Sequence, residues 1–391
     1  MAAFDGQIHG EGVAAMTRAL ILEHPQTRPH HWLFIEDQNN GAIVSSLGFI
    51  PWALHIDDLE IKSGEMGIVG TAESHRGRGL VRHLVSRHAA LLQEEGCLLS
   101  HIQGIPYFYR QFGYEYAIPL ESHWRLELHQ APKNPGGYRL RPADLQDIPQ
   151  LQQLYKREAR RLTIGSRRDA AIWGYLLGPG KNTETATDIY LLENTAGTNQ
   201  GYISIPHRGF GDGVIVAEVA GLKDESARAV LAWLCNRART QEKPYLRLNL
   251  PPTNTLVQTA RSLGASDQGS YAWQIHLPDP GQLLQHLTSL FERRLAASPL
   301  AGETRILNLD LYRRAWQLRF DQGCLDAISP ANPGDGNALR LPPLLAAPLL
   351  TGYRSSDELI DQHHDVYVDR SCQQLAAVLF PRVHSFIHTI Y

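Results

Sequence analysis

The first part of the chain takes its fold from residues 65–82, EMGIVGTAESHRGRGLVR. An extended run over residues 65–71 leads into a glycine-rich turn at residues 76–79. Apolar residues then recur at helical spacing, which predicts a helix over residues 80–95. A helix that begins directly after such a turn presents unpaired backbone N–H groups at the positive end of its dipole. The segment therefore predicts a binding site for phosphate oxygens.

The residue types in this turn suit a diphosphate. Gly77 and Gly79 lack a Cβ, so phosphate oxygens can come close to the backbone amides, and glycine tolerates unusual dihedral angles. Arg76, Arg78 and Arg82 add positive charge at the same place. Taken alone, the pattern is also compatible with an ordinary helix start that carries surface arginines. The decision between the two depends on the neighbouring sequence.

A second block, GIPYFYRQFGYE at residues 104–115, follows the predicted strand over residues 97–103. Together the two blocks resemble the GNAT superfamily of N-acetyltransferases, whose pyrophosphate signature is Q/R-x-x-G-x-G/A and whose closing strand follows an aromatic-rich helix. Val81 departs from the signature, because it replaces the final small residue. The resemblance implies acetyl-CoA as acetyl donor, with the pantetheine arm on the backbone of residues 69–71. The coenzyme residues that it implies are Val69, Gly70, Thr71, Arg76, Gly77, Arg78, Gly79, Leu80, Val81, Arg82 and Tyr109.

Acetyl transfer to an amine requires a neutral nucleophile, a polarised carbonyl group and a proton for the leaving thiolate. By its place in the second block, Tyr114 resembles the general-acid tyrosine of the family, although it could also be a buried strand aromatic. The resemblance implies that the terminal carboxylate of Tyr391 acts as base, whereas a merely packed terminus is the alternative. Glu65 is the rival base, or an anchor for the substrate amine, and Val69 N–H is the candidate donor to the thioester carbonyl.

Over nearly the whole chain the sequence resembles the enhanced intracellular survival family, on LLTGYRS at 349–355 and LFPR at 379–382 in addition to the first blocks. This implies an α+β protein with tandem GNAT-type mixed-sheet domains, followed by a smaller α/β domain similar to sterol carrier proteins, and a homo-oligomer that could be a hexamer. Segments rich in breakers place the boundaries. We expect a catalytic domain over residues 1–131, a degenerate GNAT-like domain over 132–280 and the third domain over 281–391.

Two features depart from a simple tandem repeat. Residues 1–12 contain no clear first strand, so that strand is either missing from the sequence or the edge of the sheet is built differently. The second domain has no R-x-x-G-x-G after Val219, so we expect that it shapes the substrate cleft and does not bind coenzyme A.

Apolar periodicity and breakers also predict the principal elements. Helices are expected over residues 12–22, 80–95, 105–111, 225–240, 255–263, 283–297, 340–350, 355–361 and 371–379. Strands are expected over residues 31–36, 42–50, 65–71, 97–103, 114–119, 188–193, 200–206, 213–221, 245–250, 305–311 and 315–320.

Composition excludes several classes of function. The net charge of −3 gives no extended basic surface for nucleic acid or an anionic membrane. The four cysteines form no C-x-x-C pair, and the histidine pairs at 30–31 and 363–364 lack a third ligand, so no metal is expected. No apolar run is long enough for a bilayer span, and the start is unlike a signal peptide, which favours the cytoplasm. A lipid or sterol carrier and a non-catalytic acyl-CoA sensor remain as competing functions.

Overall fold

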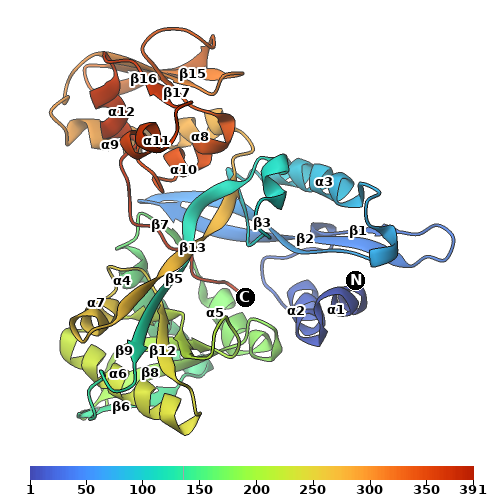
Figure 1. Cartoon of the computed structure of the whole chain (residues 1–391), viewed down its shortest axis with the longest axis vertical. Coiled ribbons are helices and arrows are strands. Elements are labelled where there is room, and N and C mark those ends of the chain that lie inside the picture. The colour runs from blue at the N-terminus through green and yellow to red at the C-terminus, as the bar shows by residue number, and fades with distance from the viewer. Residues whose placement is uncertain (135) are drawn as a thin grey trace.

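The computed structural model describes residues 1–134 and 136–391, and Pro135, within the predicted boundary segment 131–137, lies outside the described residues. The chain forms three lobes that follow one another in sequence (Figure 1). Blue and cyan elements form the first lobe, green and yellow elements the second, and orange and red elements the third.

The first lobe begins with two helices and continues as a sheet that one long helix covers. In chain order, with η for short 3-10 helices, its elements are α1 (Ala2–His9), α2 (Glu11–Leu22), η1 (Pro29–His31), β1 (Trp32–Glu36), β2 (Ile43–Ile56), β3 (Leu59–Thr71), η2 (Glu73–His75), α3 (Leu80–Glu94), β4 (Leu99–Ile102), η3 (Phe108–Phe112) and β5 (Glu115–Glu127).

The second lobe repeats the succession of strands, helix, strand and helix. Its elements are β6 (Tyr138–Pro142), η4 (Leu145–Asp147), α4 (Ile148–Ala159), β7 (Ile164–Ser166), α5 (Ala170–Leu177), η5 (Pro179–Asn182), β8 (Thr187–Asn194), β9 (Asn199–Pro206), β10 (Val214–Val216), β11 (Glu218–Ala220), α6 (Asp224–Thr240), β12 (Tyr245–Asn249), α7 (Thr255–Ser262) and β13 (Ser266–His276).

The third lobe is a small sheet with short helices against it. Its elements are α8 (Pro280–His286), α9 (Thr288–Ala296), β14 (Arg305–Asp310), β15 (Ala315–Asp321), β16 (Cys324–Ala331), β17 (Ala338–Arg340), η6 (Pro343–Leu345), α10 (Ala346–Leu350), α11 (Ser356–Gln362), β18 (Tyr367–Val368) and α12 (Gln373–Leu379).

Among the described residues the strands form three sheets. The largest has the order β1-β2-β3-β4-β13-β5-β12-β10, with β7 paired to β2. A second sheet has the order β11-β9-β8-β6, and the third has the order β16-β15-β14-β17-β18. The large sheet therefore continues from the first lobe into the second.

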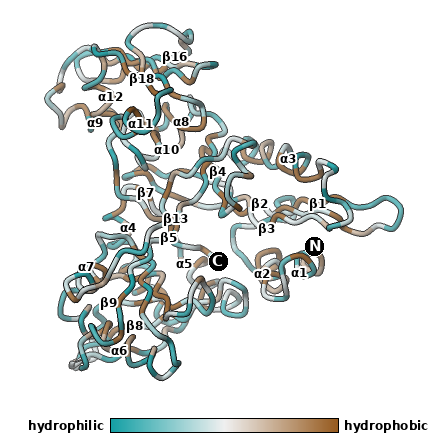
Figure 2. The backbone as a smooth tube through the Cα atoms, viewed as in Figure 1, coloured by the Kyte–Doolittle hydropathy of each residue, from teal (hydrophilic) through white to brown (hydrophobic). Residues whose placement is uncertain are grey.

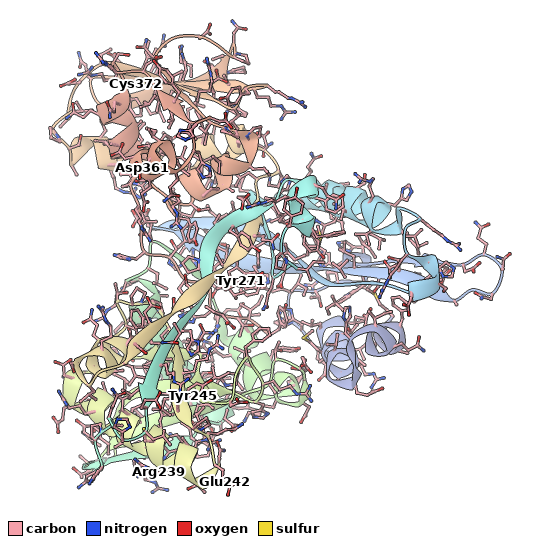
Figure 3. All side chains as sticks on the ribbon, in the orientation of Figure 1. Arg239, Glu242, Tyr245, Tyr271, Asp361 and Cys372 are labelled. Atoms are coloured by element: carbon pink, nitrogen blue, oxygen red, sulfur yellow. The ribbon has the colours of Figure 1, made fainter. Side chains whose placement is uncertain are left out.

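Two long antiparallel strands, β5 and β13, join the first two lobes. β13 comes from the second lobe, yet it pairs with β4 of the first lobe at one end and with β5 along its length. β5 comes from the first lobe and pairs with β12 of the second. Tyr271, on β13, lies where the two strands cross the middle of the molecule (Figure 3). The predicted boundary near residue 131 thus divides the chain at a point where the sheet does not end.

The start of the chain is helical, and the edge of the sheet is formed by β1. Asp5 on α1 is completely buried and accepts hydrogen bonds from Thr17 Oγ1 at 3.0 Å and Ser46 Oγ at 2.7 Å. These bonds connect α1 to α2 and to β2. Residues 2–9 are therefore helical, and β1 is the edge strand of the large sheet.

The loop between β1 and β2 is hydrophilic (Figure 2), whereas most residues of β2 are buried. One core cluster includes Trp52 from the first lobe, Trp173 from the second and Phe291 from the third. The three lobes therefore pack together through a shared apolar core. No helix among the described residues is long and apolar enough to cross a membrane.

Two predicted helices of the third lobe were wrong in detail. The expected helix over 283–297 is two helices, α8 and α9, which meet at Leu287. Residues 338–340 form strand β17, because they pair with β14, and the helix α10 starts only at Ala346.

Candidate active site

The glycine-rich turn has the backbone that the sequence predicts. Gly77 and Gly79 have φ angles of 77° and 75°, in the left-handed region that favours glycine, and Gly79 is the N-cap of α3. A Cβ added to either glycine would meet no atom within 4 Å. The turn therefore faces open space, which a ligand can enter.

The backbone amides of this turn are available to a ligand. Arg82 and His83 N–H donate to the carbonyl of Gly79 at 3.0 and 3.3 Å. Within the described part of the chain, the amides from Gly77 to Val81 have no protein acceptor. Unpaired amides at a helix N-terminus form a site for anions, and a diphosphate would satisfy them.

The arginines of the motif add charge that no carboxylate neutralises in the described structure. Arg82 donates to Gln111 Oε1 at 3.1 Å and lies over the Phe112 ring. Because Phe112 belongs to η3, this contact brings the two sequence blocks together.

In the second lobe, the corresponding N-terminus of α6 leaves no space for a phosphate group. Lys223 N–H donates to Ser226 Oγ at 2.8 Å, so a side chain of α6 caps the helix. A Cβ at Gly221 would lie only 2.8 Å from the carbonyl oxygen of Gln200. This difference supports the expectation that coenzyme A binds to the first lobe alone.

Strands β3 and β4 separate in the middle of the sheet. They pair in parallel from Ser63 to Glu65, and β3 then continues to Thr71 beside β2. Between Gly67 and Gly70 two residues of β3 lie opposite one residue of β2, and Ile68 has a φ of 51°. This is a β-bulge at a strained β-branched residue, and bulges of this kind redirect backbone groups near functional sites.

We predict that Gly79→Asp raises the KM for acetyl-CoA by about tenfold or more, because a carboxylate would repel the diphosphate, while the left-handed backbone costs only about 1–2 kcal/mol. Steady-state kinetics and isothermal titration with acetyl-CoA measure the effect. Gly197→Asp is a matched control, since Gly197 has a φ of 73° and open space around its Cβ position but lies far along the chain from the motif. Wild-type affinity in Gly79→Asp would reject this coenzyme site.

Tyr114 directly precedes β5 and is only 1% exposed. Its hydroxyl lies 2.7 Å from Ser100 Oγ, which itself donates to the Gly64 carbonyl at 2.7 Å. Ser100 Oγ therefore accepts a hydrogen bond from the Tyr114 hydroxyl. Burial raises the pKa of Tyr114 above its ordinary value, so the phenol stays protonated. Its ring packs with Met66 and Leu84 on the side of the sheet that α3 covers.

Glu65 extends from the place where β3 and β4 separate, and it is 3% exposed. Its carboxylate accepts hydrogen bonds from Trp52 Nε1 at 2.9 Å and from the Tyr391 hydroxyl at 2.8 Å. Burial raises the pKa of Glu65 to about 7, although both hydrogen bonds act in the opposite direction. The carboxyl group thus titrates near neutral pH, as a general base requires.

The C-terminal residues run from the third lobe to the first, and several of their side chains are buried. Ile387 and Ile390 are 2% and 0% exposed, and the label C in Figure 1 marks the end between the first two lobes. The structure brings Tyr391 and Glu65, the two rival bases of the sequence, into one hydrogen bond. The contact is made by the Tyr391 side chain, while its main-chain oxygen accepts from Thr389 Oγ1 at 2.6 Å. Sequence reasoning missed Trp52, which nothing local distinguishes from a core tryptophan.

Other groups noted in the sequence lie away from these residues. Glu95 lies 3.1 Å from His30 Nε2 and 3.4 Å from His31 Nε2, a third group that spacing could not reveal. Because His31 Nδ1 accepts the Arg28 N–H at 3.0 Å, its Nε2 carries the proton that points to Glu95. His31 therefore donates a hydrogen bond to the Glu95 carboxylate.

A cavity of about 840 Å³ lies in the second lobe between Asp188, Gly209 and Lys243.

A protein-family model described as an acetyltransferase (GNAT) domain matches residues 17–117, which include both the turn at 76–79 and Tyr114. The chain carries a GNAT acetyltransferase domain. An acyl-CoA donor follows from that family, and so does an acceptor for the acyl group. Residues 17–117 therefore form a domain of an acetyltransferase family, and the chain is that of an enzyme.

Solved structures resemble the protein over nearly its full length. A GCN5-related N-acetyltransferase from Anabaena variabilis has a TM-score of 0.72 and 16% identity, with 99% of this chain and 95% of that one covered. A probable N-acyltransferase from Enterococcus faecalis has a TM-score of 0.67 and 16% identity, with coverage of 89% and 86%. Eis1 from Mycobacterium abscessus has a TM-score of 0.61 and 16% identity, with coverage of 92% and 90%. At these identities the likeness concerns the fold, and no curated protein sequence matches.

Proposed function

We propose that the GNAT enzyme transfers an acetyl group from acetyl-CoA to a primary amine by direct attack in a ternary complex. The observation that carries the proposal is the placement of Glu65 and Tyr114 around the point where β3 and β4 separate. Glu65 and Ser100, the partner of Tyr114, are neighbours across that point, because Ser100 pairs with Gly64. A thioester held between the strands would meet a base on one side and an acid on the other.

The proton transfers assign one role to each group. The Glu65 carboxylate takes a proton from the amine, whose nitrogen then forms a bond to the thioester carbon. As the carbon–sulfur bond breaks, the Tyr114 hydroxyl donates its proton to the leaving thiolate. The amide of Val69, at the bulge in β3, would donate to the carbonyl oxygen as charge develops there.

Between the two rival bases, the structure favours Glu65. Its raised pKa of about 7 suits proton transfer near neutral pH, whereas an ordinary α-carboxyl group, with a pKa of about 3.5, is a weaker base. The Tyr391 hydroxyl, which donates to Glu65, would hold the carboxylate in place beside the amine.

We further infer the three-domain division at residues 131 and 280, with a third domain that is similar to sterol carrier proteins, and a homo-oligomeric assembly. A lipid carrier is the second candidate, and an acyl-CoA sensor without turnover is the third. The burial of Glu65 between Trp52 and Tyr391 favours catalysis over the sensor, because binding of acyl-CoA alone would not need a buried carboxylate at this place.

The test is release of free thiol from acetyl-CoA in the presence of a panel of primary amines, with mass spectrometry of each amine. We expect thiol release that depends on at least one amine and yields its acetamide. A Gly79→Asp sample controls for thioester hydrolysis that does not use the coenzyme site. Tight acetyl-CoA binding without turnover for every amine would support the sensor instead.

A further inference from the structure

A buried ion pair in the second lobe lies far from the coenzyme turn in sequence. Arg168 donates to both carboxylate oxygens of Glu218, at 2.8 and 2.7 Å, and the two side chains are 2% and 7% exposed. A buried ion pair is costly unless further hydrogen bonds satisfy both groups. The partners of this pair therefore indicate what it is for.

Some of these partners come from the second lobe itself. The guanidinium group of Arg168 lies 4.5 Å from the Tyr155 ring centroid and 4.9 Å from that of Trp173. The Tyr202 hydroxyl donates to Glu218. Together these contacts fix both side chains in one orientation.

The remaining partners come from the C-terminal segment, residues 384–391. Arg168 also donates to the carbonyl of Thr389, and His388 Nδ1 lies 3.6 Å from Glu218 Oε2. Beside them, Ser166 Oγ donates to the carbonyl of His388 at 2.6 Å. Both charged residues thus contact the segment two or three residues before Tyr391.

The residues that contact the C-terminal segment are joined to the sheet that carries Glu65. Strand β7 pairs with β2 through Gly165 and His55, and β2 pairs with β3, which carries Glu65. On its other side, Ile164 accepts a hydrogen bond from the Phe386 amide at 3.0 Å. The position of the C-terminal segment is therefore defined relative to the catalytic strand.

We propose that Arg168 and Glu218 are positioning residues that hold the C-terminal segment so that the Tyr391 hydroxyl reaches Glu65. The inference rests on the proposed function, in which Glu65 is the base, and it gives the second lobe a role in that reaction. An extended chain advances about 3.3 Å per residue, so a slip of one residue at Thr389 would break the Tyr391 hydrogen bond. The carboxylate would then become accessible to water.

The test replaces the pair in the full-length protein with two methionines, Arg168→Met and Glu218→Met, because apolar residues of similar volume can substitute for a buried pair without loss of stability. A matched control replaces Arg247 and Glu121, a second ion pair at 2.6 Å, in the same way. Hydrogen exchange of the Phe386 amide, kcat and KM, and a carbon-13 NMR titration of Glu65 are the readouts.

We expect faster exchange in residues 384–391, a kcat lower by about tenfold to a hundredfold and a nearly unchanged KM for acetyl-CoA. The titration midpoint of Glu65 should fall toward its ordinary value as water enters, because burial is the largest cause of the raised pKa and outweighs the loss of the Tyr391 hydrogen bond, which acts in the opposite direction. In a Tyr391→Phe background the same pair replacement should lower kcat little further, because both changes act through one contact.

Any of four results would overturn the inference: unchanged exchange at Phe386, faster exchange with an unchanged Glu65 midpoint, faster exchange with wild-type kcat, or equal effects in the control pair. A wild-type protein that acetylates no amine would instead defeat the proposed function, and the exchange and titration would still decide whether the pair positions Tyr391.

Discussion

Glu65→Gln is expected to lower kcat by about 10²-fold to 10⁴-fold, the range for loss of a general base. The variant keeps the shape of the side chain and an acceptor for the Trp52 indole, so the fold should survive. In the wild type, kcat should rise with pH through about 7, because the carboxyl group must lose its proton before it can act. The variant should lack that rise, and a pH series of initial rates measures both effects.

The same residue predicts a pH dependence of stability. Because burial raises the pKa of Glu65 from 4.5 to about 7, the folded protein binds one more proton than the unfolded chain between these values. Stability contributed by this group is therefore present at low pH and is lost as pH rises through about 7. Denaturant unfolding at several pH values should show a decline in the wild type that is smaller in Glu65→Gln.

Glu60→Gln is the control for both measurements, since Glu60 lies on the same strand but its side chain is 59% exposed and pairs with Arg167. A pH profile of Glu65→Gln that still rises through about 7 would exclude Glu65 as the base. In that case the carboxylate of Tyr391 becomes the candidate.

Tyr114→Phe is expected to lower kcat by about 10²-fold or more and to leave the KM for acetyl-CoA nearly unchanged, because the leaving thiolate loses its proton donor. The fold should lose only about 1 kcal/mol. Ser100 keeps its own acceptor, the carbonyl of Gly64, so no buried donor is left unpaired. Steady-state kinetics with the best amine of the panel, beside thermal unfolding, measure the two quantities.

The control for this substitution is Tyr190→Phe, which removes the hydroxyl group from a half-buried tyrosine of the second lobe. Wild-type kcat in Tyr114→Phe would make Tyr114 an ordinary core aromatic. A rise in the KM for acetyl-CoA with kcat unchanged would assign it to coenzyme binding.

The coenzyme turn could be predicted from sequence because its chemistry is local. The left-handed backbone at Gly77 and Gly79 favours glycine, and the helix start follows within one residue. Tyr114 and Glu65 could also be singled out as candidates, since each lies beside a recognisable block. The principal helix and strand positions of the first lobe follow from periodicity in the same way.

The remaining features depend on contacts between residues far apart in the chain. Strand β13 was missed because it opens with exposed polar residues at 266–270, and its pairing with β4 of the first lobe makes it a strand. The hydrogen bond from Tyr391 to Glu65 spans 326 residues. Arg168 could be assigned no partner from its neighbours, because its partner Glu218 lies 50 residues away.

The crossing of β5 and β13 has a consequence for how the enzyme is made. The strand next to β4 in the catalytic sheet is supplied by residues 266–276, so the sheet is incomplete while a ribosome is still translating the second lobe. Until β13 is synthesised, β4 of the first lobe lacks the main-chain hydrogen bonds that β13 provides. Catalytic competence therefore arises late in synthesis, when both lobes exist and each completes the other.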